Sequence, residues 1–175
     1  MRYKIKDIPS EGLLVQLDIP RALFGDALEG MDADLDKTTG NLRVELNKDR
    51  DDNVYARGDL KALVTVPCAT CLGPALIKID APLKLTFVPE GDEAEAGNDP
   101  LDDQDISTYD GESVDLAPIV RESIILGIPM SPHCREGCLG LCATCGQNKN
   151  ERDCGHQPEA LGDPRFAALK NLKLT

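Results

Sequence analysis

The chain begins with alternating apolar and polar residues. Four stretches of the first 89 residues follow this pattern: 15–19, 42–46, 60–66 and 83–87. A period of two is typical of strands that bury one face, and such strands are usually antiparallel. Pro20 and the residues after it predict one short helix, and Asp51-Asp52-Asn53 predicts a hairpin turn between two of the strands. The first half of the chain is therefore expected to be an antiparallel β region.

After residue 115 the apolar residues follow a helical period. The spacing is set by Leu116, Ile119, Val120, Ile124 and Ile128. Asp115 is placed to cap this helix, and Gly127 and Pro129 are expected to end it. A last helix is predicted to begin at Asp163-Pro164, because an acidic cap followed by proline is typical of a helix start.

The negative charge is concentrated between these two halves. The 175 residues carry a net charge of −12, and residues 90–115 alone hold eleven acidic and no basic side chains. Runs of like charge repel and resist compaction, which favours a solvated linker. An acidic arm that contacts a basic partner is the alternative interpretation.

Together these patterns predict an α+β fold in three parts. An antiparallel β region occupies 1–89, an acidic flexible connector 90–112, and residues 113–175 contain a helix, a zinc-binding cysteine region and a C-terminal helix. The connector is too poor in apolar residues to offset the entropy of ordering it, so we expect a metal staple to hold the flanking parts together.

Composition narrows the class of protein. Tryptophan is absent and only three Tyr and three Phe occur, too few for a platform that stacks nucleic-acid bases. No apolar run reaches the 18 or so residues of a membrane span, and no secretory signal is readable at the N-terminus. We therefore expect a cytoplasmic protein, in which seven cysteines are metal ligands or reduced thiols rather than disulfides.

The candidate chemistry lies in the cysteines. Two Cys-Ala-Thr-Cys turns, each followed by a glycine that we expect at positive φ, present pairs of sulfurs on one side of the chain. With one histidine, the candidate zinc ligands are Cys68, Cys71, Cys134, Cys138, Cys142, Cys145, Cys154 and His156. Zinc takes four ligands, so the set fits one or two structural ions.

Distance along the chain predicts how these ligands divide. Residues 142–156 hold four candidates within a short span, and Cys134 and Cys138 would then close on Cys68 and Cys71. A single C-terminal cluster that leaves the first pair as a free dithiol remains the alternative. His133 is expected outside the ligand set.

Enzymatic chemistry is not indicated. The chain has no phosphate-binding glycine loop, no nucleophile elbow and no metalloprotease motif, so no catalytic residues and no small-molecule substrate are predicted. A redox role for Cys68 and Cys71 would call for a βαβ setting, whereas strands flank this pair.

Three segments resemble the YceD family, also catalogued as DUF177, the large-ribosomal-RNA-subunit accumulation proteins. They read VTVPCATCL at 64–72, DL at 115–116 with RESIILGIP at 121–129, and CLGLCATCGQNKN at 138–150. The family often ends its cysteine region with C-x-C, where this chain has Cys154-Gly155-His156. Imidazole also binds zinc, so the swap preserves a metal site.

The resemblance implies a non-enzymatic role in 23S rRNA accumulation and large-subunit assembly, with 23S rRNA or a pre-50S particle as partner. A net acidic protein gains no long-range attraction to phosphate, which favours an adaptor for a basic ribosomal protein. Arg135, Lys149, Arg152 and Arg165 could form a local basic patch for direct contact. A redox or metal sensor is the third interpretation.

Overall fold

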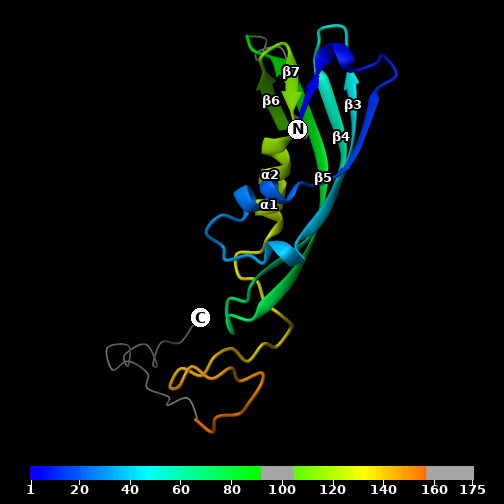
Figure 1. Cartoon of the computed structure of the whole chain (residues 1–175). Helices are drawn as coiled ribbons and strands as arrows, with labels where there is room; N and C mark the ends of the chain where they lie inside the picture. The colour runs from blue at the N-terminus through cyan, green and yellow to red at the C-terminus, as the bar shows by residue number, and fades with distance from the viewer. Residues whose placement is uncertain (92–104, 157–175) are drawn as a thin grey trace, which may run out of the picture.

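The structure is a computed structural model that describes residues 1–91 and 105–156 (Figure 1). The strands are β1 (Arg2–Lys4), β2 (Leu13–Asp18), β3 (Thr39–Lys48), β4 (Val54–Pro67), β5 (Pro74–Pro89), β6 (Asp105–Tyr109) and β7 (Ser113–Asp115). The helices are α1 (Arg21–Ala27), α2 (Ala117–Gly127) and the short 3-10 helices η1 (Ile5–Asp7) and η2 (Leu35–Lys37). The α+β fold class is confirmed.

The main sheet has the strand order β2-β3-β4-β5-β6, and β1 pairs with β7 in a smaller sheet. The pairs from β2 to β5 are antiparallel, as the alternation predicts, and Val15 lies opposite Val44. The predicted short helix is confirmed as α1, and the predicted turn lies between β3 and β4. Strands β4 and β5 form a long hairpin that extends toward the cysteine-rich end of the molecule (Figure 1).

One apolar core joins the β region to α2. Leu42, Leu60 and Val64 from the sheet are fully buried, as are Val120 and Ile124 from the helix, and all belong to one cluster. This shared core corrects the expectation that a metal staple holds residues 113–128 against the sheet. The helical apolar spacing after residue 115 is the reason, because it gives α2 a stripe to bury against the inner face of the strands.

The close approach of α2 to the sheet depends on a glycine. A Cβ at Gly127 would lie 2.5 Å from the Cγ2 atom of Ile79 on β5. Such a separation is a clash, so only glycine allows the last turn of the helix to sit on this strand. Gly127 also ends the helix where the sequence predicts.

The predicted connector over 90–112 is corrected at its C-terminal end, where residues 105–109 form β6. The strand is parallel to β5, so the sheet is mixed rather than wholly antiparallel. Tyr109 supplies the physical reason: its ring is buried and its hydroxyl donates a hydrogen bond to the Asp52 carbonyl at 2.7 Å. The rest of the connector, 92–104, and the helix predicted from Asp163 lie outside the described residues.

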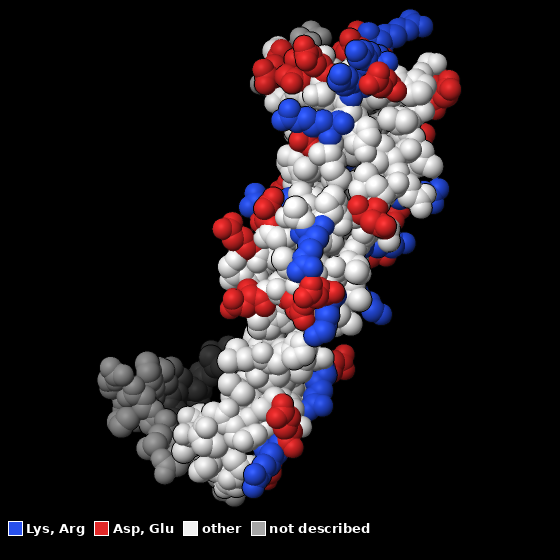
Figure 2. Space-filling view, viewed as in Figure 1, with Lys and Arg blue, Asp and Glu red and all other residues white. Residues whose placement is uncertain are grey.

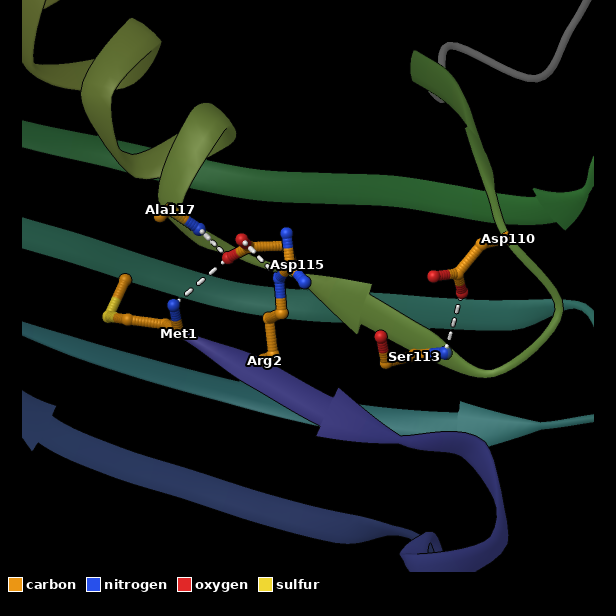
Figure 3. Close-up of polar contacts among 6 residues, drawn as sticks. All are labelled: Met1, Arg2, Asp110, Ser113, Asp115 and Ala117. Carbon is orange, nitrogen blue, oxygen red and sulfur yellow. Dashed lines mark hydrogen bonds and ion pairs between the residues drawn. The ribbon is translucent and has the colours of Figure 1, made fainter.

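Asp115 fastens the start of α2 to the N-terminus (Figure 3). Its carboxylate accepts hydrogen bonds from the Ala117 N–H at 2.9 Å, the Met1 amine at 3.0 Å and Arg2 at 3.3 Å. Leu116, not Asp115, is the residue that directly precedes the helix. Partial burial raises the pKa of Asp115, but these donors outweigh it and hold the pKa below its ordinary value.

Candidate metal centres

Four cysteines meet where the β4–β5 hairpin touches the chain that follows α2. Cys68 and Cys71 lie at the tip of the hairpin and are buried, and the half-buried Cys134 and Cys138 approach them. The Sγ–Sγ distances are 3.9 Å for Cys68–Cys138, 3.6 Å for Cys71–Cys134 and 3.7 Å for Cys134–Cys138. We call these four residues the first group.

Backbone hydrogen bonds hold the two chain segments of the first group together. The N–H of Ala69 donates to the Pro132 carbonyl at 2.7 Å, and the N–H of Leu141 donates to the Thr70 carbonyl at 3.1 Å. The tip of the hairpin closes through the Cys68 N–H and the Gly73 carbonyl at 2.7 Å. The sulfurs are therefore placed by strand pairing and loop contacts.

The residue at positive φ in this turn differs from the expectation. Leu72, with a φ of 60°, takes the left-handed conformation there, whereas in the second Cys-Ala-Thr-Cys turn Gly146 takes it as predicted. A leucine in this conformation is strained, because its Cβ crowds the backbone. The turn closes around Leu72, whose N–H donates to the Cys68 carbonyl at 3.0 Å, while the Cys68 N–H donates to the Gly73 carbonyl.

The first group fits a tetrahedral zinc ion. Zinc–sulfur bonds of about 2.3 Å in a tetrahedron place neighbouring sulfurs about 3.8 Å apart. The three distances above bracket this value, and all four sulfurs lie within 4.8 Å of one another. Four thiolates are also a soft ligand set of the kind that zinc and iron bind in tetrahedral sites.

The ionisation of the thiols is consistent with a cation at their centre. The Thr70 hydroxyl and neighbouring N–H groups lower the pKa of Cys68 to about 5, and a hydrogen bond from Thr70 is the main cause that lowers the pKa of Cys138 to about 7. Burial and the adjacent sulfurs raise the pKa of Cys134 to about 12. Like charges so close cannot all ionise alone, whereas a bound zinc deprotonates every coordinating thiol.

A second group forms further along the chain from Cys142, Cys145, Cys154 and His156. Their ligand atoms also lie within 4.8 Å of one another. Cys142 is buried, Cys154 is half-buried and the other two are exposed. The N–H of Cys145 is the largest of the causes that lower the pKa of Cys142 to about 6.

The loop of the second group is a small hairpin. Leu141 and Asn148 form an isolated bridge, and the Cys142 N–H donates to the Gln147 carbonyl at 2.8 Å. The Gly146 N–H donates a hydrogen bond to the Cys142 carbonyl at 2.8 Å. Three sulfurs and one imidazole again form a set typical of a structural zinc site.

The structure thus brings the eight candidates together in the grouping that chain distance predicts. The alternative with Cys68 and Cys71 as a separate dithiol does not match, because both lie against Cys134 and Cys138. His133 is exposed, its Nδ1 atom lies 2.8 Å from the Ser131 carbonyl, and it belongs to neither group. Within the described residues, these are the groups of His, Cys, Asp and Glu that could hold a metal.

Sequence reasoning missed two residues that contact the sulfurs. The Thr70 hydroxyl donates to the Cys138 sulfur at 3.1 Å, and the Asn150 side-chain amide donates to the same sulfur at 3.3 Å. Both residues lie inside the cysteine motifs: Thr70 in the first Cys-Ala-Thr-Cys turn, and Asn150 in the Asn-Lys-Asn that follows the second turn. Polar side chains between the cysteines are the sequence signal that could have indicated these hydrogen bonds to sulfur.

The charged surface shows no single sign. On the face seen in Figure 2, Lys and Arg are interspersed with Asp and Glu along the length of the molecule. Three exposed apolar side chains, Leu72, Met130 and Leu139, occur near the cysteines in sequence. No helix in the described part of the chain has the length and apolar character to cross a membrane.

The fold and the two cysteine groups define a small α+β protein whose C-terminal part is organised around candidate metal sites. The chain belongs to the YceD family: the family model described as "Large ribosomal RNA subunit accumulation protein YceD" matches residues 56–173. The family is thus named for accumulation of the large ribosomal RNA and not for an enzymatic reaction.

Curated relatives agree with this assignment. Uncharacterized proteins of Mycobacterium tuberculosis and Mycobacterium bovis are 30% identical over 133 residues, which is 75% of this chain and 60% of theirs. The match therefore spans only about 60% of the length of these relatives. The chloroplastic large ribosomal RNA subunit accumulation protein YCED homolog 1 of Arabidopsis thaliana is 32% identical over 64 residues, 35% of this chain and 19% of that protein. No solved structure matches the chain.

Proposed function

We propose that this protein is a non-enzymatic cytoplasmic factor that supports the accumulation and processing of 23S rRNA and the assembly of the large ribosomal subunit. Membership of the YceD family carries the proposal. The proposed cofactor is structural zinc, one ion in each cysteine group. Bound there, the metal would cross-link chain segments, and the protein residues would supply all four ligands of each ion.

The first group supports a structural rather than a catalytic role for the metal. Its four sulfurs lie within 4.8 Å of one another and would fill all four positions of a tetrahedral zinc, which leaves no open position for water or substrate. A catalytic zinc keeps such a position. The strand pairing that places Cys68 and Cys71 makes the site part of the fold.

Complementation of a strain that lacks the protein tests this role. We expect the wild-type chain to restore the ratio of 23S to 16S rRNA, and Cys71→Ser combined with Cys134→Ser to fail. The matched control is Thr144→Ser, because Thr144 is exposed beside the second group and should support full accumulation. Normal 23S rRNA levels in the strain without the protein would overturn the proposal.

How the protein contacts a pre-50S particle is a separate question, and the charge of the cysteine region bears on it. RNA binding is driven mainly by Lys and Arg contacts to phosphate and by counterion release. Residues 129–156 hold Arg135, Lys149 and Arg152, but also three acidic residues, and bound zinc thiolates would add negative charge. This balance favours the second candidate, an adaptor that binds a basic ribosomal protein.

Salt dependence separates these candidates. Direct binding of the purified protein to 23S rRNA should weaken steeply with salt, whereas an adaptor should show no binding at any salt concentration. The acidic stretch gives a second test, in which its acids are replaced by Ser and Gln. Unchanged 23S rRNA accumulation would make the stretch a spacer; reduced accumulation with unchanged zinc content would make it an arm for a basic partner.

A further inference from the structure

Asn150 connects the two cysteine groups, although it is a ligand of neither. It lies in the chain between Cys145 and Cys154 of the second group, yet its side-chain Nδ2 atom donates to the sulfur of Cys138 in the first group at 3.3 Å. Cys138 also receives the Thr70 hydroxyl at 3.1 Å. The sulfur is thus hydrogen-bonded by the hairpin of one group and the loop of the other.

The side chain of Asn150 is fixed at both ends of its amide. Its Oδ1 atom accepts from Arg135 at 2.7 Å and from the Leu139 N–H at 2.9 Å. These two donors turn the NH₂ group toward the sulfur. Asn148 completes the arrangement, because its Oδ1 atom accepts both the Asn150 N–H at 3.0 Å and the Asn150 Nδ2 at 2.8 Å.

The position of Asn150 depends on the loop of the second group. A metal bound by Cys142, Cys145, Cys154 and His156 would close the chain on both sides of Asn150. Closing a loop removes conformational freedom, so the amide would be held at Cys138 before the first group binds its metal. A hydrogen bond to the ligand sulfur stabilises the thiolate and orients it.

We propose that Asn150 couples the two groups, so that metal in the second group raises the affinity of the first group for metal. The inference rests on the proposed metal binding and adds a positioning residue and a direction of influence. Linkage requires the coupling to be reciprocal, so metal in the first group must raise the affinity of the second by the same factor. Mutation of a residue that orients a metal ligand typically lowers metal affinity about 10- to 100-fold.

A binding cycle on the full chain tests the coupling. The second group is disabled by Cys145→Ser with Cys154→Ser, and the first by Cys71→Ser with Cys134→Ser. Zn²⁺ affinities are measured by competition with a chromophoric chelator in each variant and in the wild type. We expect the wild-type product of the two affinities to exceed the product from the single-group variants by about 10-fold or more.

Asn150→Asp then tests the residue itself. It keeps an oxygen to accept from Arg135 and Leu139, but removes the N–H that donates to Cys138. In this variant, the ratio of the full-chain affinity product to the product from the single-group variants should fall to about one. In the chain with an intact second group, Co²⁺ in the first group reports the sulfur directly, and the thiolate-to-cobalt absorption should change in energy with Asn150→Asp. The change should be smaller where the second group is disabled. Gln147→Ala is the matched control in the same loop and should leave both readouts unchanged.

The outcomes separate the two proposals. Two ions that bind with independent affinities in the wild type would overturn the coupling and leave the structural metal role intact. The same excess affinity in wild type and Asn150→Asp would overturn the role of Asn150. A chain that binds no Zn²⁺ at all would overturn the metal sites of the proposed function, and the coupling with them.

Discussion

The sheet with its helices, residues 1–91 and 105–128, and the cysteine region, residues 129–156, are built differently. The first contains a continuous apolar core whose largest members are fully buried. In the second, the buried residues are Gly140 and Cys142, and pairing is limited to one isolated bridge. Apolar burial can stabilise the first region by itself, whereas a segment with so little core needs another source of free energy.

The largest expected effect is that of removing the metal. A structural zinc contributes about 10–16 kcal/mol of apparent binding free energy in zinc-finger peptides near neutral pH. We expect a strong chelator to abolish protection from hydrogen exchange in residues 129–156 while β3, β4 and β5 keep theirs. Mass spectrometry of exchange with and without chelator measures this. Equal protection of residues 129–156 in both samples would show that metal does not stabilise the cysteine region, and the contrast drawn between the two regions would be wrong.

A cavity in the core is expected to destabilise the sheet and its helices while the metal sites stay occupied. Leu60 is fully buried in β4, and Leu60→Ala should lower the free energy of unfolding by about 2–5 kcal/mol. Zinc content per chain should stay unchanged. Leu14→Ala is the control, because Leu14 is 57% exposed on β2 and its loss should be nearly neutral. Loss of zinc from the folded Leu60→Ala chain would show that the two regions are not separable.

Loss of one ligand should lower the stability of the fold more in the first group than in the second. Cys68 is fully buried within the core cluster, whereas Cys154 is half-buried in a local loop. Cys68→Ser loses its metal contact and buries a hydroxyl, a change that by itself costs about 1–3 kcal/mol. The thermal unfolding midpoint should fall more for Cys68→Ser than for Cys154→Ser. Equal midpoints would mean that the second group stabilises the sheet as much as the first.

The repeated Cys-Ala-Thr-Cys turn offers a matched pair of threonines. Both threonines are exposed, and the Thr70 hydroxyl contacts the sulfurs of Cys68 and Cys138. Thr70→Val should weaken zinc binding to the first group by about 10-fold, because it removes a hydrogen bond to a thiolate. Thr144→Val should leave the affinity of both groups unchanged. Chelator competition measures both variants, and equal effects would show that the Thr70 hydroxyl makes no specific contribution to zinc binding by the first group.

The smallest expected effect concerns pH and Asp115. Its pKa is lowered in the folded chain, so its contribution to stability is present above the unfolded pKa of about 3.9 and is lost as pH falls through the folded value. Asp115→Asn should therefore flatten the dependence of stability on pH below about pH 4. The change should be below about 1 kcal/mol, since the carboxylate is partly exposed. Urea unfolding at several acidic pH values measures it.

The sequence predicts the parts of the fold that depend on local periodicity. Alternation identifies which side of β3 or β4 is buried, and helical spacing locates α2, because both signals come from adjacent residues. Alternation does not identify which strand is the neighbour, so the parallel pairing of β6 with β5 is missed. The acidic residues on both sides of β6 also hid its short apolar signal.

The candidate metal sites divide in the same way. Ligand type and spacing predict the two groups, because a Cys-x-x-Cys turn presents its sulfurs together wherever it occurs. The contacts of Thr70 and Asn150 with Cys138 cannot be read from spacing. They require segments that are 68 and 12 residues apart in the chain to meet at one sulfur, and that meeting is a property of the folded loops.

The pairing of β1 with β7 sets an order for folding during synthesis. Met1 and Asp115 are 114 residues apart, so the first strand has no partner until the seventh has been made. At 5–20 residues per second, this takes about 6 to 23 s. The β3–β4 and β4–β5 hairpins need only nearby residues and can form earlier. A nascent chain of this protein therefore carries β1 without its β7 partner until residues 113–115 have been made.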